Sequence, residues 1–381
     1  MKKLVSIFGS TGSIGKNTIQ VIKEKPELFK VMVLTAKSDV KGLISQARDL
    51  RPDYVVIENE KLESDLRQGL CDIKKIKILS GKSALEEVAQ IKCDLFISAI
   101  VGFAGMVPTI NAIRAGSNIG LANKESLVCA GKILTNLAKK HGSKIIPIDS
   151  EHNAIYQVFE GGNQKLIDNI ILTASGGPFF NQDKPLNQIT VEEALNHPKW
   201  KMGKKISIDS ATMMNKGLEI IEAFYLFPLK KDQIKAIIHP QSVIHGMINY
   251  LDGSTLAMMS NPDMKTPISY ALSYPGRLSI KHNKLDLLKV KNLEFIKIDK
   301  KKFPAIDICY RALEEGGSSP VVLNAANEVA VKRFLNGEIS FDKITKIVAK
   351  ALDSMSVDNV SDIGEVISFD KRARELSKNL N

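Results

Sequence analysis

Two carboxylates, a hydroxyl and an imidazole stand together in Asp149-Ser150-Glu151-His152, directly after the apolar run at 144–148. The apolar run predicts a short buried strand, and if strand geometry continues, Asp149 and Glu151 project to the same side. Two carboxylates on one face repel each other unless a proton or a cation lies between them. Ligand sets made only of oxygens suit a hard divalent ion such as Mg²⁺ or Mn²⁺ better than zinc. The alternative for so short a motif is a solvated turn after a strand.

A second cluster of reactive side chains lies at 207–219. With Ser210 near a helix start, Asn215, Lys216 and Glu219 fall on nearby helix faces, at spacings of one, three and four residues. Glu219 is a candidate third carboxylate for a metal site. The alternative is an ordinary surface pattern of charged residues on a helix.

A serine followed by two glycines, Ser175-Gly176-Gly177, comes at the end of the apolar run 170–174. A hydroxyl and backbone amides at such a turn are suited to binding an anion. The nearby loop at 197–203 holds His197 and the only tryptophan, Trp200, among lysines. This loop is either a mobile lid over a ligand or an ordinary anchored loop.

The N-terminal stretch predicts the elements of a nucleotide-binding unit. A buried strand at 3–8 leads into Gly9-Ser-Thr-Gly-Ser-Ile-Gly15 and then a helix, so glycines and helix amides face a pyrophosphate. After the next strand, at 31–35, come Lys37 and Ser38, one cation and one hydroxyl, which suit the 2′-phosphate of NADP. Asp39 could instead hold the ribose 2′-hydroxyl of NAD, so NAD is an alternative cofactor. A plain surface turn without a cofactor role is a third interpretation.

Strands alternate with helices up to residue 149, which predicts an α/β fold with an N-terminal doubly wound, Rossmann-like domain. One later strand ends in a glycine turn at 101–105, and another ends in Asn123-Lys124-Glu125. This polar tripeptide either lines the edge of the sheet where ligands bind or caps the start of a helix. Helical periodicity from 304 onward predicts a C-terminal helical bundle. We predict an NADPH-binding domain at 1–149 and a central α+β catalytic domain at 150–273, with a flap near 197–205. A linker at 274–301 then leads to the helical domain at 302–381.

Two further polar motifs have open roles. His239 and His245 are six residues apart, which places them on the same face of a predicted strand, where a structural role with a hydrogen-bond partner is favoured. The polar turn at 324–328 either reaches back to the site or forms a buried cap.

Composition narrows the class of protein. The chain has 381 residues, 44% hydrophobic and 25% charged, with a net charge of +11. Four scattered cysteines without paired spacing disfavour a zinc ribbon or a disulfide framework. No apolar run approaches the ~20 residues of a membrane span, and no signal peptide is evident, so we expect a cytoplasmic protein. Because aromatics make up only 6% and no nucleic-acid motif appears, the positive charge favours small phosphorylated anions, or reflects a lysine-rich proteome.

These motifs together resemble the 1-deoxy-D-xylulose 5-phosphate reductoisomerase family of the non-mevalonate isoprenoid pathway. The resemblance runs through nearly the whole chain in the family's order, in GSTGSIG at 9–15, ANKESL at 122–127, DSEHNA at 149–154, SGGPF at 175–179, HPKWKMG at 197–203, DSATMMNKGLE at 209–219 and HPQSVIH at 239–245. Where the family often has glycine and asparagine around its 2′-phosphate lysine, this chain has Ala36 and Ser38.

The resemblance implies a role for each site residue. One divalent cation, Mg²⁺ or Mn²⁺, would be held by Asp149, Glu151 and Glu219, with Lys124 also catalytic. His152 is counted with the catalytic residues as a helper near the substrate, and the alternative is a structural residue that closes the turn. Substrate contacts would come from Lys124, Ser150, Glu151, Ser175, His197, Trp200, Ser210, Asn215, Lys216 and Glu219. NADPH contacts would come from Thr11, Gly12, Ser13, Ile14, Ala36, Lys37, Ser38, Asn123, Glu125, Met202 and Gly203, with Trp200 and Met202 on the closing flap.

The implied activity is the rearrangement and NADPH-dependent reduction of 1-deoxy-D-xylulose 5-phosphate to 2-C-methyl-D-erythritol 4-phosphate by a homodimer. A retro-aldol path and a 1,2-shift both suit these residues. Two rival functions stay open: a metal-free NADP-dependent dehydrogenase of another phosphorylated metabolite, and a dinucleotide-sensing protein that binds nucleic acid.

Overall fold

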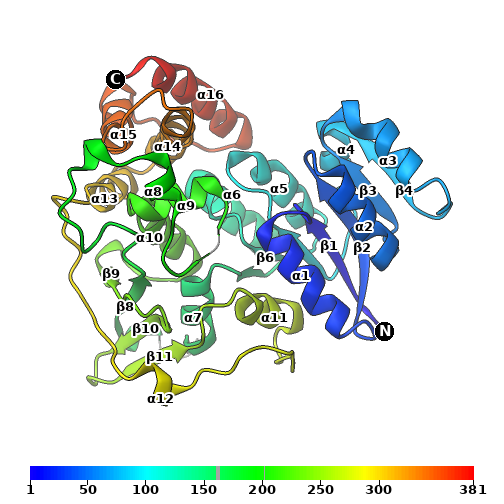
Figure 1. The fold of residues 1–381 in the computed structure, drawn as a ribbon, viewed down its shortest axis with the longest axis horizontal. Helices are drawn as coiled ribbons and strands as arrows, with labels where there is room; N and C mark the ends of the chain where they lie inside the picture. The colour runs from blue at the N-terminus through cyan, green and yellow to red at the C-terminus, as the bar shows by residue number, and fades with distance from the viewer. Residues whose placement is uncertain (160–163, 201) are drawn as a thin grey trace. The chain divides into compact units, whose positions relative to one another are not determined.

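The computed structural model describes residues 1–159, 164–200 and 202–381 (Figure 1). The chain forms two compact units, the first from Met1–Ser126, Leu134–Asn153 and Asp263–Asn283, and the second from Leu127–Ile133, Ala154–Pro262 and Lys284–Asn381. These units do not follow the predicted domain ranges one for one, because residues 263–283 pack in the first unit and the C-terminal helices share the second unit with a sheet. The assignment of functions to the predicted ranges stays a prediction.

The first unit is built on a seven-stranded parallel sheet in the order β4-β3-β2-β1-β5-β6-β7. Its central strands are continuous apolar runs, as expected where helices cover both faces of a parallel sheet. The doubly wound fold is therefore confirmed. The strands are β1 Lys3–Phe8, β2 Phe29–Ala36, β3 Tyr54–Ile57, β4 Lys77–Ser80, β5 Leu95–Ser98, β6 Asn118–Leu121 and β7 Ile145–Pro147.

Amphipathic helices connect these strands and bury their apolar stripes against the sheet. One core cluster joins strand residues such as Ile7 and Leu34 to Ile19 of α1 and Leu272 of α11. The helices are α1 Ser13–Glu24, α2 Val40–Leu50, α3 Glu63–Gly69, α4 Gly81–Val88, α5 Met106–Arg114, α6 Lys124–His141, α7 Ser150–Val158 and α11 Lys265–Ser273, with the short 3₁₀ turns η1 Glu60–Leu62 and η2 Phe103–Gly105. The middle of α6 and the end of α7 are assigned to the second unit.

The second unit holds a four-stranded sheet in the order β11-β10-β8-β9, in which β10 is antiparallel to both its neighbours. Its strands are β8 Ile167–Ala174, β9 Ile234–Ile238, β10 Ile244–Tyr250 and β11 Thr255–Met259. Around it lie α8 Val191–Leu195, α9 Lys204–Ala211, α10 Met214–Leu226 and α12 Leu287–Val290, with η3 Gln164–Leu166, η4 Leu186–Gln188 and η5 Lys231–Gln233.

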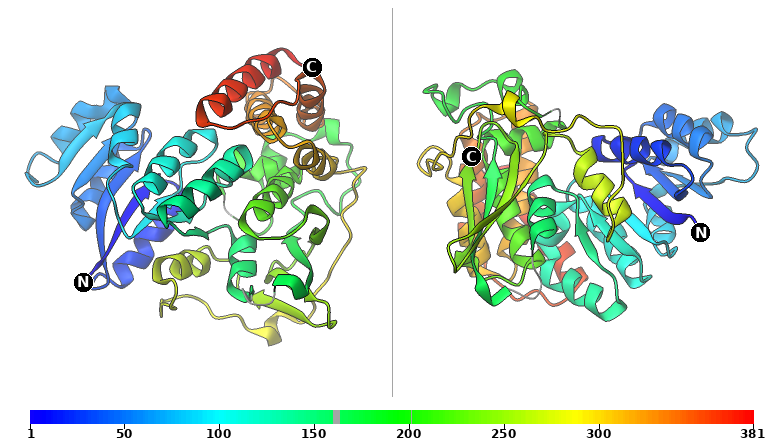
Figure 2. Two further views of the ribbon diagram at one scale, coloured as in Figure 1. Left: turned by 180° about the vertical axis from the view of Figure 1, so that it is seen from behind. Right: turned by 90° about the horizontal axis from the view of Figure 1, so that it is seen from below.

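Four helices end the chain, as the helical periodicity from residue 304 onward predicts: α13 Ala305–Glu315, α14 Ser319–Leu335, α15 Lys343–Ser354 and α16 Ile363–Asn379. Figure 2 shows the last three as one group. Their buried faces share a core cluster with the sheet and with α10, which includes Leu172, Leu218, Ile306 and Val348. The helical region thus packs onto the central sheet, and α14 and α15 also share a second core cluster with α8 and α9.

The strand predicted to continue through Asp149 and Glu151 is wrong, although the two carboxylates do come together, with ligand oxygens within 4.8 Å of each other. Strand β7 ends at Pro147, and α7 begins at Ser150, where the Asp149 carbonyl accepts a hydrogen bond from Asn153 N at 2.8 Å. Asp149 therefore precedes the helix and Glu151 lies in its first turn. Asp and Ser favour the start of a helix, because their side chains compete well for free backbone amides.

Two other local predictions fail. His239 and His245 do not share a strand, because a turn with Pro240 and with Ser242 at φ 54° separates β9 from β10. Both histidines are nevertheless buried and hydrogen-bonded, His239 to the Glu294 carbonyl and His245 to Ser260. Ser210 lies in the last turn of α9 and not at a helix start.

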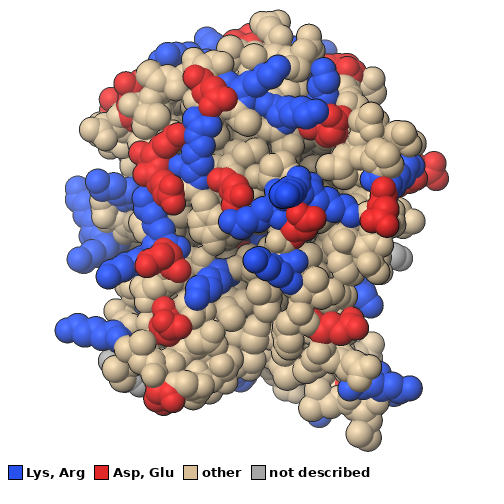
Figure 3. All heavy atoms as spheres, turned by 90° about the vertical axis from the view of Figure 1, so that its left-hand side faces the viewer, with Lys and Arg blue, Asp and Glu red and all other residues tan. Residues whose placement is uncertain are grey.

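In the described part of the chain, no helix combines the length and the hydropathy needed to cross a membrane. Figure 3 shows Lys and Arg side chains spread over one face, with Asp and Glu side chains among them. On this face the positive charge forms no single continuous stripe of the kind that nucleic acid binding favours.

Candidate active site

In the first unit, the loop between β1 and α1 has no room for a side chain at Gly9 or Gly15. A Cβ atom on Gly15 would lie 2.4 Å from the Gly9 carbonyl oxygen, and one on Gly9, whose φ is 88°, would lie 2.6 Å from the Ala99 oxygen. Gly12 is the N-cap of α1 and provides no side-chain cap. The first amides of α1 are therefore accessible to an anion, as at a pyrophosphate site.

Two residues that the sequence did not single out hold this loop. Thr35 Oγ1 accepts from Gly9 N at 3.0 Å, and Gln46 Nε2 donates to the Ser10 carbonyl at 2.9 Å. The Ser10 hydroxyl donates to Gln46 Oε1 at 2.7 Å. These contacts join residues 26 to 36 positions apart, so no local pattern predicts them.

The residues after β2 distinguish between the two cofactor interpretations. The Asp39 carboxylate caps α2 by accepting from Gly42 N at 2.9 Å, so it is engaged in local structure. Lys37 and Ser38 are exposed, whereas the Ala36 side chain is buried at the end of β2. The cation and hydroxyl available here favour a 2′-phosphate over a free ribose hydroxyl.

Asn123 caps α6, as one interpretation of its motif predicts: its side-chain oxygen accepts from Ser126 N at 2.9 Å. Its amide group donates to the Gly102 carbonyl at 2.8 Å, which fixes the glycine turn against the start of α6. Lys124 follows and forms an ion pair with Asp149, in which both side chains are mostly buried. Within the first unit the structure thus brings together two of the predicted catalytic residues.

The remaining residues of the 149–152 motif lie at the start of α7. The Ser150 hydroxyl donates to Glu151 Oε2, and His152 is fully buried. Asp149 and Glu151 are both partly exposed, and carboxylate oxygens of this kind fit a hard divalent cation.

In the second unit, Ser175 and His197 are in contact although 22 positions separate them. His197 Nε2 lies 3.0 Å from Ser175 Oγ, and His197 Nδ1 accepts from the Lys199 and Trp200 amides at 3.1 and 2.9 Å. Because Nδ1 is an acceptor, the ring proton belongs on Nε2, which donates to Ser175. The serine hydroxyl then has its own proton to donate to an anion.

Burial lowers the pKa of the His197 imidazole from 6.5 to about 4. The side chain is therefore neutral near pH 7 and contributes a directed N–H donor without a positive charge.

The low pKa of His197 predicts acid sensitivity of the fold. The unfolded imidazole protonates near 6.5 and the folded one near 4, so the unfolded state binds more protons between these values. The free energy of unfolding should fall as pH drops from about 6.5 toward about 4, and less so in His197→Gln. NMR titration of the wild-type protein, assigned with this variant, measures the folded pKa. A folded midpoint near 6.5 contradicts the assignment.

The Ser175 loop packs on the corner between α9 and α10. A Cβ on Gly177, whose φ is 66°, would lie 2.8 Å from the Ser210 carbonyl oxygen, so this close approach requires glycine. Met213 turns the chain with a left-handed φ of 61°, and Met214 N donates to Thr212 Oγ1 at 3.3 Å. The corner thereby holds Ser210 beside the loop and places Asn215 and Lys216 in the first turn of α10.

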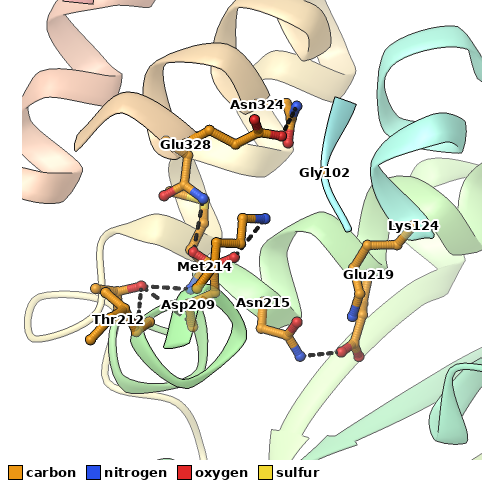
Figure 4. A network of polar contacts seen from close by, with 12 residues as sticks. Gly102, Lys124, Asp209, Thr212, Met214, Asn215, Glu219, Asn324 and Glu328 are labelled. Carbon is orange, nitrogen blue, oxygen red and sulfur yellow. Dashed lines mark hydrogen bonds and ion pairs between the residues drawn. The ribbon is translucent and has the colours of Figure 1, made fainter. Parts of the chain in front are cut away.

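Glu219 is fully buried on α10, one turn beyond Asn215 and Lys216. The Asn215 amide donates to Glu219 Oε1, as Figure 4 shows, and Lys216 forms an ion pair with Oε2. This pairing is more than a surface pattern, because Lys216 and Glu219 are both buried. The predicted substrate residues Ser175, His197, Ser210, Asn215, Lys216 and Glu219 thus share the second unit. Ser175 bonds to His197, Asn215 and Lys216 bond to Glu219, and Ser210 lies on the corner against which the Ser175 loop packs.

The predicted flap is described in part. The Trp200 ring lies 6.4 Å from the His245 ring, Met202 is half-buried, and Gly203 is the N-cap of α9 with open space around it. Lys201 lies outside the described residues. The roles of Trp200, Met202 and Gly203 toward ligands stay predictions.

Sequence reasoning missed the residues that support Ser210 from behind. Asp209, 1% exposed, pairs with Lys205 at 2.8 Å and accepts from the Asn327 amide at 2.8 Å. Figure 4 shows Asp209 beside Thr212. Asn327 belongs to the polar turn at 324–328, which therefore contacts the residue next to Ser210; the 118 positions between Asn327 and Asp209 explain why no local pattern predicts this contact. A role of this turn in the ligand site stays a prediction.

Three family models match successive parts of the chain. Residues 5–131 match the model of 1-deoxy-D-xylulose 5-phosphate reductoisomerase, residues 145–227 that of its C-terminal domain, and residues 259–376 that of the DXP reductoisomerase C-terminal domain. Proteins named 1-deoxy-D-xylulose 5-phosphate reductoisomerase are similar over nearly the full length. The one from Thermodesulfovibrio yellowstonii is 48% identical over 380 residues, 99% of either chain, and the one from Chloroherpeton thalassium is 48% identical over 374 residues, 98% of this chain and 96% of its own.

Solved structures are similar over the same extent. The reductoisomerase from Zymomonas mobilis in complex with NADPH has a TM-score of 0.93 and 41% identity, covering 99% of this chain and 98% of its own. A DOX-P reductoisomerase in complex with NADPH, fosmidomycin and magnesium has a TM-score of 0.94 and 41% identity, covering 98% and 97%.

Proposed function

Because the chain belongs to the 1-deoxy-D-xylulose 5-phosphate reductoisomerase family, we propose that it converts 1-deoxy-D-xylulose 5-phosphate to 2-C-methyl-D-erythritol 4-phosphate with NADPH and one divalent cation. The observation that carries this proposal is the anion site of the second unit. There Ser175 and the neutral His197 stand beside the α9–α10 corner, which bears Ser210, Asn215 and Lys216.

The donor set of this site suits a phosphate. Hydroxyl, amide and imidazole donors give direction, and the buried Lys216 gives positive charge. Binding the phosphate at a distance from the reacting carbons orients those carbons and stabilises the transition state through remote binding energy.

The cation is assigned to Asp149, Glu151 and Glu219, whose oxygens are the ligands that Mg²⁺ and Mn²⁺ prefer. NADPH is assigned to the glycine loop through Thr11, Gly12, Ser13 and Ile14, with Lys37 and Ser38 at the 2′-phosphate. Ala36, Asn123, Glu125, Met202 and Gly203 complete the assigned cofactor contacts. The open amides of α1 and the capping role of Asp39 support this choice of NADP over NAD.

A bound cation supplies Lewis-acid polarisation of the substrate's carbonyl and hydroxyl oxygens, and bound NADPH supplies the hydride. The chain's own residues bind and orient the substrate. Ser150 and Lys124 are assigned to its backbone oxygens, and His152 is fully buried on α7. Trp200 and Met202 are assigned to the flap that excludes water while the rearranged aldehyde awaits reduction.

The decisive experiment follows NADPH oxidation by the loss of its absorbance, with 1-deoxy-D-xylulose 5-phosphate as the substrate. After treatment with EDTA, activity should disappear and return on addition of Mg²⁺ or Mn²⁺, because no side chain replaces the Lewis acid. Full activity without metal would instead favour the metal-free dehydrogenase. Salt-dependent DNA binding without turnover would favour the nucleic-acid-binding alternative.

We assign the protein to the cytoplasm and, as the resemblance suggests, to a homodimer. Support for self-association is the edge strand β11, where Thr255, Leu256 and Ala257 are exposed, since free strand edges and apolar side chains favour pairing. Sedimentation equilibrium of the full chain measures the mass of the assembly.

A further inference from the structure

The buried carboxylate of Glu219 has an ammonium group as its counter-ion. Lys216, 3% exposed and three residues before it on α10, forms the ion pair, while Asn215 donates to the other oxygen (Figure 4). An ionised carboxylate at 0% exposure requires such a partner, because burial removes the water that would otherwise stabilise the charge. In the second unit Glu219 is therefore already neutralised and hydrogen-bonded.

The first unit repeats this arrangement independently. Lys124, at the start of α6, forms an ion pair with Asp149, with side-chain exposures of 9% and 18%. Two of the three carboxylates assigned to the cation thus each contact a lysine. The same two lysines, Lys124 and Lys216, are the ones assigned to the substrate.

We infer that Lys124 and Lys216 are exchangeable counter-ions, which neutralise Asp149 and Glu219 before a cation binds and move to the anionic substrate once it has bound. This inference rests on the proposed function. A carboxylate oxygen that accepts from an ammonium group has that lone pair engaged, and an ammonium close to a divalent cation is repelled by it. Lysine is suited to the exchange, since its ammonium sits on a flexible four-carbon stem.

Two consequences distinguish an exchangeable counter-ion from a purely structural ion pair. First, the exchangeable lysine competes with the cation, so removing its ammonium group should strengthen cation binding. Removing a purely structural lysine would leave cation binding unchanged or weaken it. Second, the displaced ammonium becomes available to phosphate, so cation and phosphate should bind with positive coupling that is equal in both directions.

The test uses the full chain freed of metal with EDTA, titrated with Mn²⁺ and followed by the EPR signal of free Mn²⁺, without NADPH or substrate. Lys216→Met should bind Mn²⁺ about tenfold or more tightly than the wild type, within the usual range of coupling between sites. Lys216→Arg should stay near the wild type, because it keeps the charge. Lys184→Met is the matched control, since Lys184 pairs with Glu193 in the same unit at 2.6 Å, away from the assigned carboxylates.

Equal or weaker Mn²⁺ binding by Lys216→Met overturns the exchange. Lys124→Met gives a second, separate measurement in the first unit if Lys216→Met does not fold, as judged by circular dichroism. Titration of inorganic phosphate with and without Mn²⁺ completes the test: the wild type should bind phosphate more tightly with Mn²⁺, and Lys216→Met should lose this gain. Failure of the wild type to bind Mn²⁺ at all overturns the metal assignment of the proposed function, a result distinct from unchanged affinity in the variants.

Discussion

Replacement of Glu219 by Gln is expected to reduce turnover by about 10³-fold or more while NADPH affinity stays within about twofold of the wild type. The substitution keeps the shape of the side chain and removes its charge. Polarisation by a cation contributes several kcal/mol to such reactions, and each ~1.4 kcal/mol is a tenfold change in rate. Steady-state rates at saturating metal and a fluorescence titration of NADPH measure the two effects.

A fold-stability effect has to be separated from this loss, because Glu219→Gln also leaves the buried Lys216 without its partner. Asp370→Asn is a matched control. Asp370 is also buried and also pairs with a cationic side chain four residues away, Arg374, but on α16. We expect this control to lose stability in chemical denaturation and to keep its turnover when folded. Unchanged turnover in Glu219→Gln would remove Glu219 from the cation site.

Substitution of Gly15 by Ala is expected to weaken NADPH binding by about 5- to 150-fold. The new Cβ would lie 2.4 Å from the Gly9 oxygen and 2.5 Å from backbone atoms of Ser10, so the loop must shift. Forced shifts of packed atoms cost about 1–3 kcal/mol, which corresponds to roughly 5- to 150-fold in affinity. The shifted loop is the one whose backbone amides are assigned to the pyrophosphate of NADPH, so NADPH binding should weaken.

Gly276→Ala is the matched control for this variant, in the same unit. A Cβ there meets its nearest atom, the Ser273 oxygen, at 3.5 Å, an ordinary contact. NADPH dissociation constants from fluorescence quenching compare the two variants with the wild type. Wild-type affinity in Gly15→Ala would mean that the cofactor does not depend on the glycine loop.

The sequence predicts the first unit well, since its structure depends on local patterns. Buried runs such as Val55-Val56-Ile57 are typical of a parallel sheet, and the glycine turn after β1 marks the start of α1. Strand β4, Lys77–Ser80, was not predicted, because four residues that include a lysine and a serine carry too little apolar pattern. The strand predicted through Asp149 was wrong because β7 ends at Pro147 and the helix α7 begins at Ser150.

The sequence predicts which residues belong to the site, but not how their side chains contact one another. The motifs identify Ser175, His197 and Lys216, but only the fold brings Ser175 to His197 and Asn327 to Asp209. The protonation state of His197 also escapes sequence reasoning, because it depends on burial and on two backbone amides that the folded loop directs at Nδ1.

The neutral His197 has a consequence for ligand design. Under the proposed assignment, the pocket has several directed donors but takes its positive charge from Lys216, so it recognises tetrahedral shape more than net charge. A phosphonate keeps three acceptor oxygens in the phosphate arrangement and should be a good isostere. A carboxylate has two coplanar oxygens, which leaves some of the donors from Ser175, His197, Ser210 and Asn215 unmatched. Inhibitors of this protein are therefore better built by varying the linker and the metal-binding end than by replacing the tetrahedral head group.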